Sequence, residues 1–577
     1  MISYKDVREV RFGGTFDTLG LLWAMAAGFL TLPVLYGLTR SGWMLAATVA
    51  AFGGLRLGWR VGEKIRLKAR AGAYGLEINS AVEPEHDPAG VRLGFIDESM
   101  RELVIPLADW LRHAMIVGQS GVGKTVLGEW IMFQQIANGG GLLWIDGKLD
   151  PDNLAKLHLM CVWAGREDDL LVVNPGDPSM SNTYNPMIDG DADEVASRCV
   201  SLIPTAESNA GADYYRQSAT IAISTLVTAI RTAGYAFDFA DLRVLLTRPG
   251  ALKWLGAELK RQGHADESAQ FDLFLDQFRS KDRKTGEQVL DADGLRRIFG
   301  GLGSRLAQFG AGQFGLVMNT YAPDVRIKDA VREGKIVYFM LPTMAKSEAA
   351  TALAKMAIAD FRSAVAAVQS LPVAERPARP FLGFFDEAGS YVTQAWSRMF
   401  EQARSARLVM VPAFQTRANL EVLGQELRAM VAGNTLTKVF FKPGEPDTAL
   451  WMADMIGKEM REQRSTSEST SRSRRSANLT DRMGRGATDA ASGGRSTSES
   501  LTLREDYKVT PADLMRLEKG ECIVTWRGHS VYHVQVPRVT FDDGFIARVG
   551  RFQVQRHEGD ATQADGLNIT KRPAAMR

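Results

Sequence analysis

The chain has 577 residues, which is too long for a single hydrophobic core, so we expect several folded units. Hydrophobic residues make up 45% of the chain and charged residues 24%, proportions that exclude a largely disordered protein. The formal net charge of +2 excludes a strong overall attraction to nucleic acid, so any such contact must come from local basic patches. The three cysteines are far apart and lack metal or disulfide spacing, which indicates a reducing compartment.

The N-terminal region is predicted to form a membrane hairpin. Thr18 to Leu38 is an uncharged apolar run of spanning length, and a second run, Gly42 to Leu55, follows after three residues. The alternative is a signal peptide plus a buried helix, but a signal sequence has a shorter apolar region followed by a cleavage site. Basic residues flank the hairpin on both sides, whereas the connecting loop carries only Arg40. Both ends are therefore expected in the cytoplasm.

Strand-like runs alternate with helical stretches from His113 onward. The first runs are HAMIVG, GLLWIDGK and DLLVVNP. Apolar residues at helical spacing then replace strand patterns between about residues 201 and 330. Strand-like runs resume with GKIVYFMLP, PFLGFFDE, RLVMVPAFQ, LTKVFF, ECIVTW and YHVQV, although Pro412 leaves the register of one of them open. This pattern predicts an α/β fold with a parallel sheet, interrupted by an inserted all-helical domain.

Residues 461–500 form a low-complexity segment rich in Ser, Arg, Thr and Gly. The hexapeptide RSTSES occurs in it twice, at Arg464 to Ser469 and at Arg495 to Ser500. Such a sequence cannot build a core, so it predicts either a disordered loop or an extended hairpin of two polar antiparallel strands. Its excess of arginine leaves open whether it is a solvated spacer or an element that contacts DNA phosphates.

The predicted organisation has seven parts. They are a transmembrane hairpin with basic flanks (1–70), the first part of a motor domain (71–200), an all-helical inserted domain (201–330), the second part of the motor domain (331–460), the low-complexity Ser/Arg loop (461–500), the end of the motor domain (501–550) and a loose tail (551–577).

The octapeptide GQSGVGKT, between an apolar strand and an amphipathic helix, predicts a P-loop that binds ATP and Mg²⁺. Its glycines allow backbone N–H groups to surround phosphate oxygens, because no Cβ atom intrudes. Lys124 is expected to reach the β- and γ-phosphates, and the hydroxyl of Thr125 is expected to bind Mg²⁺. The predicted nucleotide-binding residues are Gly118, Gln119, Ser120, Gly121, Val122, Gly123, Lys124 and Thr125.

Further catalytic candidates follow the later strands. In FLGFFDEAG, Asp386 is suited to hold Mg²⁺ and Glu387 to polarise the attacking water. Gln415 ends the next strand, where its amide could contact the γ-phosphate or the water; an ordinary strand-end glutamine is the alternative. Between these strands lie Arg404 and Arg407. Ring-forming motors need an arginine from the neighbouring subunit, whereas the alternative for each arginine is a solvated helix end.

Taken in order, these features resemble the type IV secretion coupling proteins of bacterial conjugation, the TraD/TraG group. The matching features are the membrane hairpin, HAMIVGQSGVGKT, DGKLD, YNP, the helical insertion, GKIVYFMLP, FFDEAG, ARSARL, the strand ending in glutamine, and GNTLTKVFF. The resemblance spans nearly the whole chain. It implies a RecA-like motor that forms a hexamer at the bacterial inner membrane, with two spans and a cytoplasmic motor. It also implies ATPase roles for Lys124, Thr125, Asp386, Glu387 and Gln415, with Arg404 as the arginine finger.

The implied activity is ATP-driven transfer of DNA, with an attached relaxase, into a secretion channel. The implied partners are single-stranded DNA bound without sequence preference, the relaxase and its accessory proteins, and channel components of the inner membrane. Two departures from the family pattern stand out. DGKLD replaces the usual Asp-Pro-Lys-Gly, which leaves the roles of Asp146 and Lys148 open, and the loop in the hairpin is too short for a large periplasmic surface.

Three other functions compete with this interpretation. A double-stranded DNA translocase of the FtsK type carries a C-terminal winged-helix domain, and too few residues follow Val536 to build one. An ABC transporter ATPase carries an LSGGQ-like signature, which is absent before FFDEAG. A protein-cargo adaptor that binds nucleotide only structurally does not need Lys124 and Glu387, which are both present.

Overall fold

The computed structural model describes residues 7–10, 90–97, 99–203, 210–281, 286–393, 395–421, 424–472, 493–554 and 566–572. The predicted membrane hairpin, residues 18–38 and 42–55, lies outside these ranges. Among the helices that the structure describes, none combines the length and the apolar character that crossing a bilayer requires.

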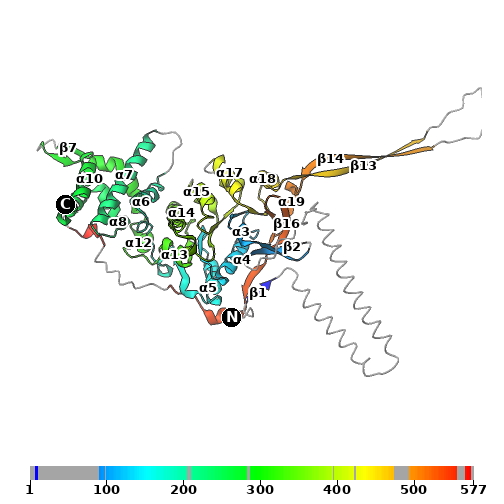
Figure 1. Ribbon diagram of the computed structural model, residues 1–577, viewed down its shortest axis with the longest axis horizontal. Helices are drawn as coiled ribbons and strands as arrows, with labels where there is room; N and C mark the ends of the chain where they lie inside the picture. The colour runs from blue at the N-terminus through cyan, green and yellow to red at the C-terminus, as the bar shows by residue number, and fades with distance from the viewer. Residues whose placement is uncertain are drawn as a thin grey trace, which may run out of the picture.

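A mixed sheet is the centre of the α/β domain that was predicted to be a motor and is called the motor domain below (Figure 1). Its strands are β2 (Val91–Ile96), β3 (Glu102–Ile105), β4 (Ala114–Val117), β5 (Leu142–Asp146), β6 (Leu170–Val173), β9 (Ile336–Met340), β10 (Phe381–Phe385), β11 (Leu408–Phe414), β12 (Thr437–Phe441), β15 (Glu521–Trp526) and β16 (Ser530–Gln535). Within the described residues the sheet has eleven strands in the order β3-β2-β16-β15-β12-β4-β11-β10-β5-β9-β6. The strands from β12 to β6 run parallel, and β15, β16, β2 and β3 extend the sheet in antiparallel pairs.

Every strand-like run identified in the sequence forms a strand of this sheet. The central strands β5, β9 and β10 are buried throughout, which explains their continuous apolar sequences. Pro412 pairs with Phe385 in the β10–β11 ladder, while the β11–β4 ladder begins only at Ala413, one residue later. The missing N–H of Pro412 therefore does not interrupt the β4 ladder. Strands β2 and β3 were not predicted; β3 has only four residues, and the pairing of β2 with β3 shifts register between Arg92 and Gly94.

Helices cover both faces of the sheet. The face that carries Ile116 packs against α4 (Lys124–Ala137), α5 (Pro151–Trp163) and α20 (Asp543–Val549). The face that carries Met115 and Val117 packs against α14 (Ser347–Gln369), α15 (Ala395–Gln402), α17 (Gln425–Asn434) and α18 (Pro446–Ile456). Neighbouring side chains of β4 therefore point alternately into two cores, as in any strand that is buried on both faces of its sheet. Shorter elements complete the motor: α3 (Leu107–Trp110), α13 (Ile327–Glu333), α16 (Arg417–Glu421), α19 (Pro511–Arg516), and β1 (Val7–Val10) paired with β17 (Arg538–Phe541).

The inserted domain is mainly helical and lies at one end of the molecule (Figure 1). It contains α6 (Ala192–Val200), α7 (Ala210–Thr232), α8 (Phe239–Thr247), α9 (Pro249–Gln262), α10 (Ala265–Asp276), α11 (Ala292–Ala307) and α12 (Gly312–Met318). It differs from the all-helical prediction by a small hairpin of β7 (Arg279–Lys281) and β8 (Gln288–Leu290). Strands of three residues are too short to show an alternating pattern. Because α6 packs against α7, the domain also begins earlier than the predicted residue 201.

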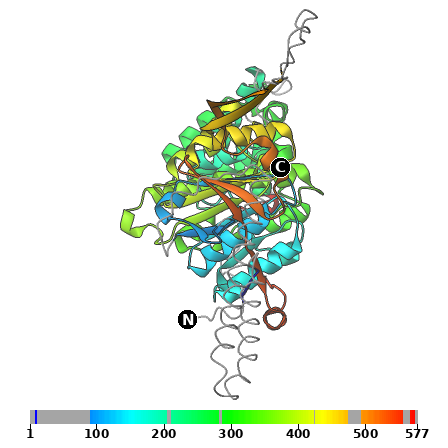
Figure 2. The same cartoon turned by 90° about the vertical axis from the view of Figure 1, so that its right-hand side faces the viewer.

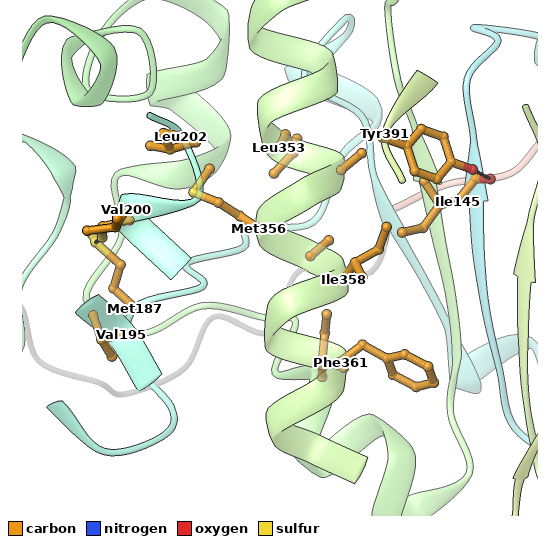
Figure 3. Packing of buried hydrophobic residues seen from close by; sticks show 14 of the residues in the cluster. Ile145, Met187, Val195, Val200, Leu202, Leu353, Met356, Ile358, Phe361 and Tyr391 are labelled. Carbon is orange, nitrogen blue, oxygen red and sulfur yellow. Dashed lines mark hydrogen bonds between the residues drawn. The ribbon is translucent and has the colours of Figure 1, made fainter. Parts of the chain in front are cut away.

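Helix α14 joins the inserted domain to the motor (Figure 3). One side of the helix, with Ile358 and Phe361, faces the strand that carries Ile145, whereas Met356 faces Val200 and the rest of α6. A buried polar cluster reinforces this junction. In it, the hydroxyl of Tyr184 donates to Asp360 Oδ2 over 2.9 Å, and Arg198 Nη1 lies 3.3 Å from Asp360 Oδ1.

The first and last parts of the Ser/Arg segment pair with each other in a polar hairpin, which is one of the two structures predicted for this segment. Strands β13 (Lys458–Arg472) and β14 (Gly493–Tyr507) are antiparallel, and their register pairs the two RSTSES copies with each other, for example Ser467 with Ser498. The hairpin projects from the motor at the end of the molecule opposite the inserted domain (Figures 1 and 2).

The C-terminal tail was predicted to be loose, but residues 566–572 pack against the folded protein. Leu567 and Ile569 are fully buried in the core that includes the inserted domain. The backbone N–H of Leu567 donates to Ala236 O over 2.7 Å, and that of Ile569 donates to Asp241 Oδ1 over 2.8 Å. Leu567 and Ile569 follow a mostly polar stretch, residues 555–566, and two apolar residues were too weak a pattern to predict this contact.

Candidate nucleotide-binding site

The P-loop connects the end of β4 to the start of α4. The N–H of Gly118 donates to Phe414 O over 3.1 Å, and the N–H of Gln119 donates to Lys442 O over 2.9 Å. These bonds hold the loop against the ends of β11 and β12. Gly121 and Gly123 have φ values of 79° and 119°, a region that residues with a Cβ rarely adopt. The sequence therefore folds here into a loop with its backbone free to face an anion.

Lys124 is the first residue of α4 and is buried. Its Nζ donates to the carbonyl oxygens of Gly118, at 2.6 Å, and Gln119, at 2.8 Å, so the ammonium lies within the loop. Burial lowers the pKa of Lys124, and the negative charge of Asp386 opposes this shift. A buried ammonium beside backbone N–H groups fits the phosphates of a nucleotide.

Thr125 and Asp386 meet beside the loop. The hydroxyl of Thr125 donates to Asp386 Oδ2 over 3.0 Å, and Asp386 is almost fully buried at the end of β10. The other carboxylate oxygen of Asp386 accepts from the N–H of Glu387 over 3.0 Å, and Tyr391 donates its hydroxyl to the carbonyl of Asp386. A hydroxyl and a carboxylate held together in this way provide oxygen ligands that suit Mg²⁺.

Glu387 lies at the same edge of the sheet, in the left-handed backbone region with φ of 54°. Its Oε1 is 3.0 Å from Lys148 Nζ and accepts from Gln415 Nε2 over 3.3 Å. The structure therefore brings together Lys124, Thr125, Asp386, Glu387 and Gln415, which come from three separate parts of the sequence. Two partners orient the carboxylate that is expected to polarise water.

Asp146 and Lys148, whose roles were open, form the wall beside Glu387. Asp146 is fully buried at the end of β5 and accepts from the N–H of Lys148, from Asn153 Nδ2 and from the hydroxyl of Tyr338, at 2.9, 2.9 and 3.0 Å. Burial raises the pKa of Asp146 to about 7, and the nearby charge of Asp386 adds to the shift. Asp146 thus fixes the turn that presents Lys148 to Glu387. Sequence reasoning missed this ion pair, although charged residues directly after a buried strand were its signal.

Arg404 and Arg407 do not join this site. Both precede β11, so they lie at the N-terminal end of a strand whose C-terminal end carries Gln415. A seven-residue strand is about 23 Å long, which exceeds the reach of an arginine side chain. Arg404 is exposed, while Arg407 is half-buried with φ of 58°. Neither arginine can therefore complete the P-loop site of its own subunit.

The chain resembles known proteins in sequence and in fold. Residues 380–519, which include Asp386, Glu387 and Gln415, match the family described as the TraM recognition site of TraD and TraG. The type 4 coupling protein DotL of Legionella pneumophila is 25% identical over 407 residues, which cover 63% of this chain and 50% of DotL. The chain is a relative of the type IV coupling proteins. It spans about half the length of DotL.

Solved structures of another coupling protein share the fold. The bacterial conjugative coupling protein TrwB, in its unbound monoclinic form, has a TM-score of 0.53 at 15% identity, covering 80% of this chain and 91% of that one. TrwB in complex with ADP and Mg²⁺ has a TM-score of 0.51 at 16% identity, covering 76% and 88%. The resemblance to coupling proteins and the RecA-like α/β fold are thereby confirmed.

Proposed function

We propose that this chain is an ATP hydrolase that drives DNA, with an attached relaxase, into a type IV secretion channel. The observation that carries the proposal is the convergence of Lys124, Thr125, Asp386, Glu387 and Gln415 at one edge of a coupling-protein fold. The relatives support the direction of the proposal, since DotL is a type 4 coupling protein and TrwB is a conjugative one with a structure in complex with ADP and Mg²⁺.

ATP with Mg²⁺ supplies the phosphoanhydride bond that is cleaved and a cation that neutralises charge on the phosphates. The N–H groups of the P-loop and Lys124 hold the phosphates. Thr125 and Asp386 place oxygen ligands at the metal position, and Glu387 accepts a proton from the attacking water. Gln415, which already contacts Glu387, orients the same water. Each step uses a group that the fold positions before the nucleotide arrives.

The active site is completed by a second subunit. Arg404 lies too far from its own P-loop, so we propose that it neutralises charge on the γ-phosphate held by the neighbouring copy. A head-to-tail contact of this kind repeats around a closed ring, and we propose a hexamer. The N-terminal hairpin anchors the ring in the bacterial inner membrane, with both termini and the motor in the cytoplasm. The relaxase, its accessory proteins and the channel components are the proposed protein partners.

Substitutions at two positions test the hydrolytic site. Lys124→Ala should weaken ATP binding because the phosphates lose their buried ammonium. Glu387→Gln should bind ATP normally but stall before hydrolysis, since only the proton acceptor is lost. Fluorescent-nucleotide binding and phosphate release, measured on the same preparations, separate the two effects. Unchanged turnover in Glu387→Gln would contradict the proposed site, and a wild-type protein that binds ATP without hydrolysing it would favour the adaptor function.

A further inference from the structure

Lys148 extends the row of polar groups along the edge of the sheet that carries the P-loop. The strands β4, β11, β10 and β5 are neighbours in this order, and their C-terminal ends meet at this edge. The groups that follow these ends are the P-loop, Gln415, the pair Asp386 and Glu387, and Lys148. The first three have roles in the proposed hydrolysis, whereas Lys148 has none beyond its ion pair with Glu387.

The backbone of Lys148 is held firmly, while its side chain is weakly held. The buried carboxylate of Asp146 accepts from the N–H of Lys148 over 2.9 Å, and the hydroxyl of Thr343 donates to Gly147 O. The Lys148 side chain is 44% exposed, and an ion pair as exposed as this one with Glu387 contributes little stability. The ammonium of Lys148 therefore exchanges Glu387 for another anion at a small cost in free energy.

The ion pair occupies the carboxylate that is proposed to accept a proton from water. Glu387 Oε1 lies 3.0 Å from Lys148 Nζ and accepts from Gln415 Nε2 over 3.3 Å. The other oxygen, Oε2, lies against Gly147, where an added Cβ would come within 3.2 Å of it. A carboxylate oxygen accepts about two hydrogen bonds, so Oε1 accepts from a water only after one of its two donors has left.

A second ammonium near Lys148 favours an anion between the two. Burial lowers the pKa of Lys124, the charge of Asp386 opposes this shift, and the charge of Lys148 adds to it. Burial also acts to lower the pKa of Lys148, but Asp386 and Glu387 outweigh it and raise that pKa, so the side chain is protonated. The two lysines are thus cations that repel each other, and phosphate oxygens placed between them relieve this repulsion.

The place of the γ-phosphate in the proposed hydrolysis is within reach of Lys148. A water that donates to Glu387 and attacks the γ-phosphate lies ~3 Å from the carboxylate and ~3 Å from phosphorus. Lys148 Nζ starts 3.0 Å from the same carboxylate. Rotation of the flexible four-carbon stem of Lys148 therefore moves the ammonium from Glu387 to an oxygen of the γ-phosphate without a change in the backbone.

We propose that Lys148 is a further catalytic residue, whose ammonium leaves Glu387 when ATP binds and contacts the γ-phosphate of that ATP. The inference rests on the proposed function, since it needs ATP at the P-loop of the same subunit. During hydrolysis the water oxygen bonds to phosphorus, the bond to the β-phosphate oxygen breaks with its electron pair leaving on ADP, and the water proton passes to Glu387. Lys148 keeps its protons and neutralises charge on the transferred group. Glu387 then releases its proton to solvent, and Lys148 returns to Glu387 as phosphate leaves.

Affinity for a mimic of the transferred phosphoryl group tests the proposal. ADP with aluminium fluoride imitates that group, whereas ADP alone has nothing at the γ-position. Lys148→Met removes the charge but keeps the length of the side chain. It should bind ADP as wild type does and bind ADP with aluminium fluoride about tenfold more weakly, less than the 10²–10³-fold of an enclosed donor, because Lys148 is half-exposed. Lys156→Met is the matched control, since it breaks a similar ion pair, with Glu129 Oε1 at 2.7 Å, and should change neither affinity.

The Glu387→Gln variant separates a direct contact from an effect through Glu387. Adding Lys148→Met to Glu387→Gln should again weaken the binding of ADP with aluminium fluoride about tenfold, because the contact is to the phosphoryl group. No further loss in this variant would mean that Lys148 acts only through Glu387, and an equal loss of ADP affinity would mean that it only holds the loop. Either result overturns the inference about Lys148 and leaves the proposed function standing. A wild-type protein that does not hydrolyse ATP would contradict both.

Discussion

Gly118 is the P-loop residue whose substitution the structure predicts most sharply. A Cβ at this position would lie 2.5 Å from Phe441 Cβ and 3.3 Å from Phe441 Cα. Both atoms belong to, or are attached directly to, the backbone of β12, so no side-chain rotation relieves the contact. An ordinary contact begins near 3.4 Å, and Gly118→Ala must therefore move the loop by about 1 Å. A displacement of this size costs about 100-fold in rate, or ~2.7 kcal/mol.

The assay is steady-state ATP hydrolysis together with fluorescent-nucleotide binding. We expect Gly118→Ala to lose about 100-fold in kcat/KM while circular dichroism stays unchanged, because the displaced loop is local. Gly444→Ala is the matched control beside the same loop. Its Cβ would lie 3.5 Å from Gln119 Cβ, an ordinary contact, so we expect activity close to wild type. Equal activity of the two variants would refute the packing argument.

Three further predictions concern neighbouring parts of the molecule. Lys148→Ala should lower kcat by about tenfold with little change in ATP affinity, because Glu387 loses one of its two partners; rapid-quench kinetics and nucleotide titration separate these quantities. The pKa of His113 is lowered from 6.5 to about 4 in the folded protein. The stability that His113 contributes is therefore present above pH 6.5 and is lost as the pH falls toward 4, and this loss of unfolding free energy totals ~3 kcal/mol. Calorimetry between pH 7.5 and 5 should therefore show a shallower decline for His113→Gln than for wild type, and parallel curves would contradict the assignment. Deletion of residues 566–577 should lower the thermal midpoint of the inserted domain, because Leu567 and Ile569 are fully buried there; an unchanged midpoint would mean that this contact contributes nothing.

The motor domain was predictable because its signals are local. Strands buried on both faces are continuous apolar runs, and the P-loop requires a fixed spacing of glycines before Lys124. The carboxyl ends of parallel strands meet at one edge, which is why Asp386 and Gln415 could be assigned to the same site before their distance was known. The ladder between the two RSTSES copies was also within reach, since a repeated polar segment can pair with itself.

The remaining features depend on contacts between distant segments, which a single sequence does not reveal. The ion pair between Lys148 and Glu387 joins residues more than 200 positions apart, and nothing near Lys148 indicates its partner. Lys438 lies in a strand whose other residues are all buried, and nothing near it in the sequence indicates that its ammonium turns back to Thr435 O. The docking of residues 566–572 likewise depends on a surface formed by several helices.

The most direct test of the central claim is the ATP hydrolysis rate of the full-length protein as single-stranded DNA is added. The account predicts that the rate rises with DNA, that Glu387→Gln stays inactive at every concentration, and that the stimulation weakens as salt is raised, because the contacts are to phosphates. Stimulation by double-stranded DNA alone would favour a translocase of the FtsK type. Hydrolysis that is the same with and without DNA of either kind would contradict the proposal that this motor moves DNA.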